Sequence, residues 1–101
     1  MARVVETYYA DGKLYISHYE NDGKKEGEYK IYHKDGQLNV ICNYINGTVE
    51  GEYKHYHKNG RLFATCNYVN GKIDGEYKLY YDNGQPYNVY NYVDGILQDK
   101  N

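Results

Sequence analysis

The sequence predicts an all-β protein: one elongated, single-layer, twisted antiparallel β-sheet of consecutive hairpins, with about eight strands. Three observations predict this fold class. The 101 residues repeat with a period of 24; each repeat holds two Asp-Gly or Asn-Gly steps; and the segments between these steps are rich in Tyr and β-branched residues. No segment shows the 3.6-residue apolar period of an amphipathic helix. An array of strand pairs is therefore expected.

The 24-residue period divides the chain into four repeats, at approximately residues 3–26, 27–50, 51–74 and 75–98. Because this length fits one domain, we expect residues 1–101 to form a single repeat domain whose units bury each other's faces. The first repeat is atypical, as terminal units often are, since Arg3 and Val4 stand where later repeats have Gly-Glu. The columns that define the period include Gly12, Gly36, Gly60 and Gly84, then Gly23, Gly47, Gly71 and Gly95, then Tyr8, Tyr32, Tyr56 and Tyr80.

Each repeat has two turn signals, such as Asp35-Gly36 and Asn46-Gly47. Both are predicted to form two-residue type I′ turns, in which the two central residues have positive φ. The first turn then places Tyr29 opposite Cys42, Ile31 opposite Val40 and His33 opposite Leu38. The second places Tyr44 opposite Val49, Cys42 opposite Gly51 and Val40 opposite Tyr53. A slip of one residue would move every side chain to the other face, so this register defines an inner and an outer face.

The predicted inner face collects most of the small and apolar side chains together with several tyrosines. Each glycine of the Gly-Glu-Tyr triplets, such as Gly51, is expected to point inward and to open space for a Tyr ring from the next strand. The predicted inner-face residues are Leu38, Val40, Cys42, Tyr44, Val49, Tyr53, Leu62, Ala64, Cys66, Tyr68, Ile73, Tyr77 and Leu79.

The predicted outer face carries aromatic cross-strand pairs beside columns of Glu and Lys. Such pairs can simply hold a sheet together. They can also form a docking strip, because Tyr offers a large contact area at a low entropy cost and is enriched at interfaces. The predicted pairs are Tyr8 with Tyr15, Tyr56 with Phe63 and Tyr80 with Tyr87, while Tyr32 faces Asn39. The candidate binding residues are thus Tyr8, Tyr15, Tyr32, Tyr56, Phe63, Tyr80 and Tyr87.

The repeat GEYKIYHKDGQL, followed by CNYINGTVE, resembles the variant form of the MORN (membrane occupation and recognition nexus) repeat. This variant also occurs in bacterial antitoxin-like proteins and in large DNA viruses of amoebae. The resemblance covers nearly the whole chain, although this sequence has no Trp. It implies a single elongated antiparallel sheet that acts as a scaffold or binding module, and it implies no catalytic residues. The matching positions are Gly27, Tyr29, Tyr32, Gly36, Leu38, Tyr44 and Gly47, with counterparts in the next two repeats.

Other functional classes find little support in the sequence. A net charge of −2, with 12 basic and 14 acidic residues, does not favour nucleic-acid binding, which needs a basic face. Cys42 and Cys66 lie two strands apart in the predicted register, too far for a disulfide or for one tetrahedral metal ion, so both are expected to be small core thiols. No catalytic set of side chains emerges. We therefore expect no enzyme activity, no metal and no cofactor.

The leading hypothesis is a non-enzymatic module or scaffold that binds another protein through the outer face or through a sheet edge. The two predicted edges, near Val4 to Tyr9 and near Ile96 to Lys100, could also support self-association. One alternative is an antitoxin-like protein that neutralises a partner toxin. Another is peripheral binding to acidic lipid through Lys30, Lys54 and Lys78, which the adjacent Glu column disfavours. The chain has no signal-peptide pattern, so a cytoplasmic location is expected, meaning the host cytoplasm or the virion if the protein is viral.

Overall fold

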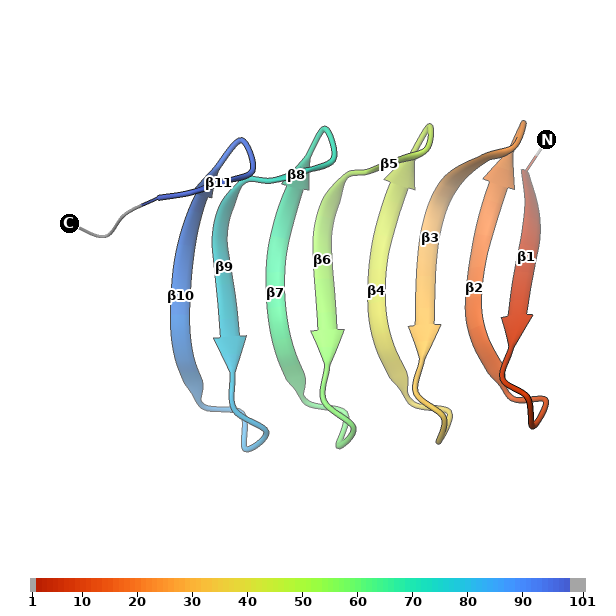
Figure 1. The fold of residues 1–101 in the computed structure, drawn as a ribbon, viewed down its shortest axis with the longest axis horizontal. Coiled ribbons are helices and arrows are strands. Elements are labelled where there is room, and N and C mark those ends of the chain that lie inside the picture. Colours follow the sequence, from red (N-terminus) through yellow and green to blue (C-terminus); the bar gives the residue numbers. More distant parts are fainter. Residues whose placement is uncertain (1, 99–101) are drawn as a thin grey trace.

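The protein forms one open antiparallel sheet, which is seen in a computed structural model that describes residues 2–98 (Figure 1). Consecutive strands lie side by side across the long axis, and the two ends of the chain lie at opposite ends of the sheet. The molecule measures 46 × 32 × 15 Å, so it is a single layer. The predicted all-β fold of consecutive hairpins is confirmed. The described residues contain no helix that could span a membrane.

The described residues form eleven strands rather than about eight. The order across the sheet is β1-β2-β3-β4-β6-β7-β9-β10-β11, with β5 beside β4 and β8 beside β7. The count is higher because two predicted strands are each split by an irregularity and because the predicted edge near Ile96 contributes a short strand of its own. The bounds are β1 (Ala2–Tyr8), β2 (Leu14–Asn21), β3 (Lys24–Tyr32), β4 (Leu38–Ile45), β5 (Thr48–Val49), β6 (Gly51–Tyr56), β7 (Leu62–Val69), β8 (Lys72–Ile73), β9 (Gly75–Tyr80), β10 (Pro86–Val93) and β11 (Ile96–Leu97).

The turn at Asn46-Gly47 is of the predicted type I′ kind. Asn46 has a φ of 52° and Gly47 a φ of 87°, and the equivalent turns in the other repeats are alike. The turns of the second, third and fourth repeats each rest on the preceding repeat. The Gly47 amide donates to the Lys25 carbonyl at 2.8 Å, and the Asn46 amide donates to a Glu26 carboxylate oxygen at 2.8 Å. The turns therefore form a hydrogen-bonded stack along one side of the sheet.

The turn at Asp35-Gly36 differs from the prediction. The His33 amide donates to the Gln37 carbonyl at 2.8 Å, and of the residues within this turn only Gly36 has a positive φ. This is a three-residue loop with a bulge at the glycine. Leu38 consequently pairs with Tyr32, so the predicted pairing with His33 is wrong. The pairs Tyr29–Cys42 and Ile31–Val40 are nevertheless confirmed, because a second bulge, with Asn39 as the extra residue of β4, restores the register.

A second irregularity lies at Gly51, between β5 and β6. Tyr44 pairs with Val49 as predicted, but Val40 then pairs with His55 instead of Tyr53, and the predicted pair of Cys42 with Gly51 is also wrong. The shift is two residues, so both faces keep their identity. A Cβ on Gly51 would meet no atom within 4 Å. Glycine therefore does not make room for a Tyr ring here; it allows the φ of 84° at which the strand shifts.

The core lies on the inner face. Its buried residues are Val40, Cys42, Ala64, Cys66 and His18. Tyr rings pair across neighbouring strands over this face, with centroid distances of 5.3 Å for Tyr29–Tyr44, 5.6 Å for Tyr53–Tyr68 and 6.1 Å for Tyr77–Tyr92. The predicted inner-face position of Leu38 is wrong, because the three-residue turn pairs it with Tyr32 on the outer face, where it lines a depression with Ile41 and Tyr56. Leu62, which pairs with Tyr56, is displaced in the same way.

Candidate binding surface

The outer face of β3, β6 and β9 repeats one pattern of Glu, Lys and Tyr. Alternation along a strand puts these three residues on the same side. Within each strand the lysine ammonium lies near the carboxylate two residues earlier, at 3.1 Å for Lys30–Glu28, 3.4 Å for Lys54–Glu52 and 3.4 Å for Lys78–Glu76. The described part of the chain is one layer thick, so no other element of it packs over this pattern.

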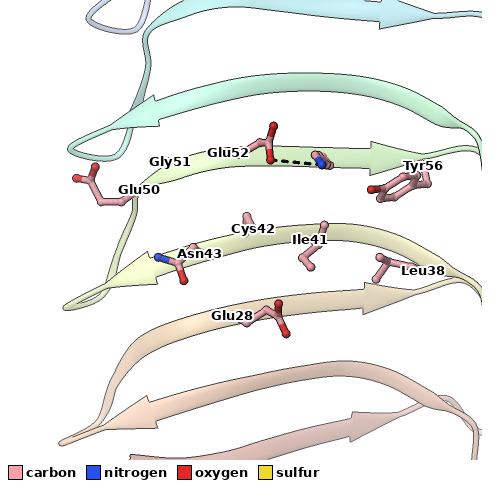
Figure 2. Close-up of a pocket in the computed structure, with 10 residues that line it drawn as sticks. Glu28, Leu38, Ile41, Cys42, Asn43, Glu50, Gly51, Glu52 and Tyr56 are labelled. Atoms are coloured by element: carbon pink, nitrogen blue, oxygen red, sulfur yellow. Dashed lines mark ion pairs between the residues drawn. The ribbon is translucent and has the colours of Figure 1, made fainter.

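A depression interrupts the outer face where β3, β4 and β6 run side by side (Figure 2). Leu38, Ile41 and Tyr56 supply its apolar lining, while Glu28 and Glu52 stand around them. The remaining lining residues are Cys42, Asn43, Glu50, Gly51 and Lys54. We call this site the outer-face depression. Its chemistry suits an apolar side chain flanked by positive charge.

Ile41 makes this depression different from its neighbour one repeat further on. The neighbouring depression is lined by Glu52, Thr65, Cys66, Asn67, Glu76 and Lys78, and Thr65 stands there in the Ile41 column. The remaining repeats have Ser17 and Val89 at this position. Sequence reasoning did not single out Ile41. The sequence does show that a large apolar residue stands at an outer-face position where other repeats have Ser17 or Thr65.

The seven predicted binding residues divide between the two faces. Tyr56 lines the outer-face depression, and Tyr8, Tyr32 and Tyr80 hold the equivalent positions in the other repeats. None of the four predicted cross-strand pairs is formed. The actual partners are Leu14 for Tyr8, Leu38 for Tyr32, Leu62 for Tyr56 and Pro86 for Tyr80.

The bulge that follows each three-residue turn explains the division. It directs the next aromatic residue to the inner face, where the Phe63 ring lies 4.9 Å from His55 and 4.8 Å from His57. Tyr15 and Tyr87 are the equivalents of Phe63. The ring centroids of Tyr15 and Tyr9 are 4.5 Å apart, and those of Tyr87 and Tyr81 are 4.6 Å apart. Binding by any of the seven residues stays a prediction.

A column of polar aromatic residues ties each repeat to the next. The Tyr9 hydroxyl donates to the Tyr32 carbonyl at 2.6 Å. In the same way His33 Nε2 lies 3.2 Å from the Tyr56 carbonyl, and His57 Nε2 lies 3.0 Å from the Tyr80 carbonyl. Burial lowers the pKa of the nearby His55, and His33 and His57 lower it further. His33 and His57 thus connect repeats, a role that the sequence reasoning did not assign.

Cys42 and Cys66 are free and buried, as predicted. Burial raises the pKa of each thiol to about 11, so both are protonated at neutral pH. Residues 2–98 contain no group of three or more His, Cys, Asp or Glu side chains placed to hold a metal ion.

The MORN repeat variant is the family whose model matches this chain, over residues 4–21, 25–46, 49–70 and 73–94. No curated protein and no solved structure matches the chain. The last three matched segments begin 24 residues apart, the same period as the hairpins of the sheet. The chain therefore belongs to the MORN repeat variant family, whose repeats act as binding or structural modules.

Proposed function

We propose that this protein is a non-catalytic module that binds another protein through its outer face, with the outer-face depression as the central contact. The observation that carries the proposal is the apolar lining formed by Leu38, Ile41 and Tyr56 on a face that no other described element covers. Interfaces concentrate their binding energy in such central apolar or aromatic pockets.

The charges around the depression favour a basic partner segment. Glu28, Glu50 and Glu52 lie at its wall and Lys54 is the one basic residue among those that line it. Glu28 and Glu52 each pair with a lysine of their own strand, but their side chains stay 51% and 66% exposed, and the lining still holds three carboxylates against one lysine. An apolar anchor next to Lys or Arg would therefore match both the lining and the wall.

The same lysines that could attract acidic lipid are already paired with glutamates. Each of Lys30, Lys54 and Lys78 lies within 3.4 Å of a carboxylate on its own strand. In each pair the carboxylate offsets the ammonium charge, so these three lysines offer an acidic lipid surface little net attraction, which supports a protein partner.

A peptide-display selection against the full-length protein tests the proposal. Peptides selected from a random library should carry a bulky apolar residue beside Lys or Arg. Their affinity should fall about tenfold or more in Ile41→Thr and in Tyr56→Ser, because both changes remove apolar contact. Ile41→Thr is compatible with the fold, since the next repeat has Thr65 at this position.

The matched control is Val89→Thr, the same kind of change in the same column of the fourth repeat, and it should leave affinity unchanged. Peptides that bind Ile41→Thr as tightly as the unchanged protein would contradict the proposal. So would peptides that lose binding only when the inner-face residues Tyr15, Phe63 and Tyr87 are changed to Ser. Sedimentation with phosphatidylserine vesicles, lost on changing Lys30, Lys54 and Lys78 to Ala, would assign the face to lipid instead.

A further inference from the structure

The two free edges of the sheet differ in their backbone hydrogen bonding. An edge strand presents unpaired amide and carbonyl groups that another strand can join. At one end this strand is β1, and at the other it is β10, which is joined only near its C-terminal end by the short β11. Residues 99–101, which include part of the second predicted edge, lie outside the described residues.

Two residues of β10 remove amide groups from its free edge. The Val89 amide donates to the side-chain Oδ1 of the preceding Asn88 at 2.9 Å, and Asn88 Nδ2 donates to the Tyr90 hydroxyl at 2.8 Å. The Val89 amide is thereby used within its own strand. Pro86, the first residue of β10, has no amide hydrogen.

The repeat columns show that this arrangement belongs to the fourth repeat alone. In the Asn88 column the earlier repeats have Ile16, Val40 and Ala64, and in the Pro86 column they have Leu14, Leu38 and Leu62. Val40 and Ala64 are buried and pair with β6 and β9. Apolar residues therefore stand in these columns where a strand is followed by another, and Pro and Asn stand where it is not.

A second copy of this chain is the occupant that the open edge would fit. Inside the sheet, β7 joins β9 through Ala64 opposite Leu79 and Thr65 opposite Lys78. Asn88 and Val89 hold the positions of Ala64 and Thr65 in the last repeat, and Thr7 and Glu6 hold those of Leu79 and Lys78 in the first. If a second copy continued the array, its Thr7 would therefore lie opposite Asn88 and its Glu6 opposite Val89. The strand β1 is long enough to supply this pairing, since it has seven residues and β9 has six.

Exposed apolar side chains at both ends support the same pairing. Val4 and Tyr8 of β1 are 53% and 54% exposed, and Tyr81, which follows β9, is 54% exposed. Tyr81 also stands in the column of Tyr9 and His57, which bond to a carbonyl of the following repeat. In a head-to-tail pair this carbonyl would belong to Tyr8 of the second copy.

We propose that the free edge of β10 can pair head-to-tail with β1 of a second copy of this chain, and that Pro86 and Asn88 prevent this pairing. We call the hydrogen bond from the Val89 amide to Asn88 Oδ1 the Asn88 cap. A head-to-tail contact of this kind does not close on itself and would grow into a filament. The cap therefore keeps the array finite, and removing it should open the edge to β1.

Sedimentation velocity over a range of protein concentrations tests this proposal. The unchanged protein should remain monomeric, whereas Pro86→Leu combined with Asn88→Ala should form dimers, trimers and larger species as concentration rises. Both replacements are residues that an earlier repeat has at the same position, so circular dichroism should show an unchanged fold. The control Asn91→Ala, the same change three residues further along β10, should stay monomeric. A double variant that stays monomeric, or an unchanged protein that associates equally, would overturn the proposal.

Two further measurements identify the cap and the occupant. Amide exchange followed by NMR at low concentration should be faster for Val89 in Asn88→Ala than in the unchanged protein or in Asn91→Ala. Equal rates would mean that Asn88 does not protect this amide. Adding Glu6→Pro to the double variant should suppress its assembly, because Glu6 is the β1 residue opposite Val89 and proline cannot donate. Assembly that persists would show that a surface other than β1 is used.

Discussion

Asn39 lies in the column where the other repeats have Tyr15, Phe63 and Tyr87. Those rings each pack against an aromatic neighbour of the inner face, tilted or edge-on. Asn39 instead has a buried Oδ1 without a hydrogen-bond partner. A buried polar atom in this state costs about 1–3 kcal/mol, so the second repeat gives up stability at this position.

Replacing Asn39 with Phe should therefore stabilise the protein. The change removes the unpaired oxygen and adds a ring that can stack on His33, so the free energy of unfolding should rise by about 1–2 kcal/mol. Thermal unfolding followed by circular dichroism should show a midpoint higher by roughly 4–8 °C for each kcal/mol. Asn39→Ala, which removes the oxygen without adding a ring, should give a smaller gain. A lower midpoint for Asn39→Phe would show that the column cannot accept a ring in this repeat.

The buried thiols and phenols make the protein sensitive to high pH. Burial raises the pKa of Cys42 and Cys66 to about 11 and that of Tyr53 to about 12, while an unfolded thiol ionises near pH 8.5. Above that pH the unfolded chain holds fewer protons than the folded one, so the free energy of unfolding must fall as pH rises.

Urea unfolding between pH 7.5 and 10.5 should show this fall, and the loss should be shallower in the double variant Cys42→Ala and Cys66→Ala. An equal slope in both proteins would mean that the thiols do not contribute, and that the Tyr residues account for the whole dependence.

At the scale of the elements, the two kinds of turn show what the sequence could and could not predict. Asn46-Gly47 and Asp35-Gly36 look alike as dipeptides, and both were predicted as type I′ turns. At Asp35, however, the carboxylate accepts the Gln37 amide at 2.9 Å, which stabilises a wider loop. The strands on either side were still predicted correctly, because the bulge restores the register after one residue.

Substitution of Gly51 tests why a glycine stands at this position in successive repeats. Gly51→Ala should lower the free energy of unfolding by about 1–2 kcal/mol, since an L-residue is strained at a φ of 84° although a Cβ would meet open space. Gly51→Asn should recover part of this loss, because Asn tolerates positive φ better than Ala. Chemical denaturation measures both. If Ala costs nothing and only large side chains destabilise, packing rather than backbone conformation would be the cause.

The outer-face depression was only partly predictable. Tyr56 was expected on the outer face because tyrosines recur at this column. Leu38 was placed on the wrong face, since its position depends on the length of the preceding turn. Ile41 could not be predicted from the repeat pattern, because that pattern consists of what the repeats share. The depression depends instead on a residue that differs between repeats, since the next repeat has Thr65 at this position.

At the scale of the whole molecule, each repeat contacts only its neighbours along the sheet. Inserting a second copy of residues 51–74 between Asp74 and Gly75 should therefore lengthen the sheet without altering its ends. Two added strand positions correspond to about 10 Å, which small-angle X-ray scattering can measure as an increase in the maximum dimension. Thermal stability should rise, because the insertion adds a repeat and an interface. An unchanged dimension, or loss of the strand signal in circular dichroism, would mean that the repeats are not interchangeable.

The strands cross the long axis of the sheet, and the two chain ends lie at its opposite ends (Figure 1). A force that pulls these ends apart acts across the strands, so it loads the hydrogen bonds of one hairpin at a time. The molecule should then yield by peeling from its extremities at low force, lengthening in steps of one hairpin, instead of resisting as a unit and rupturing at once.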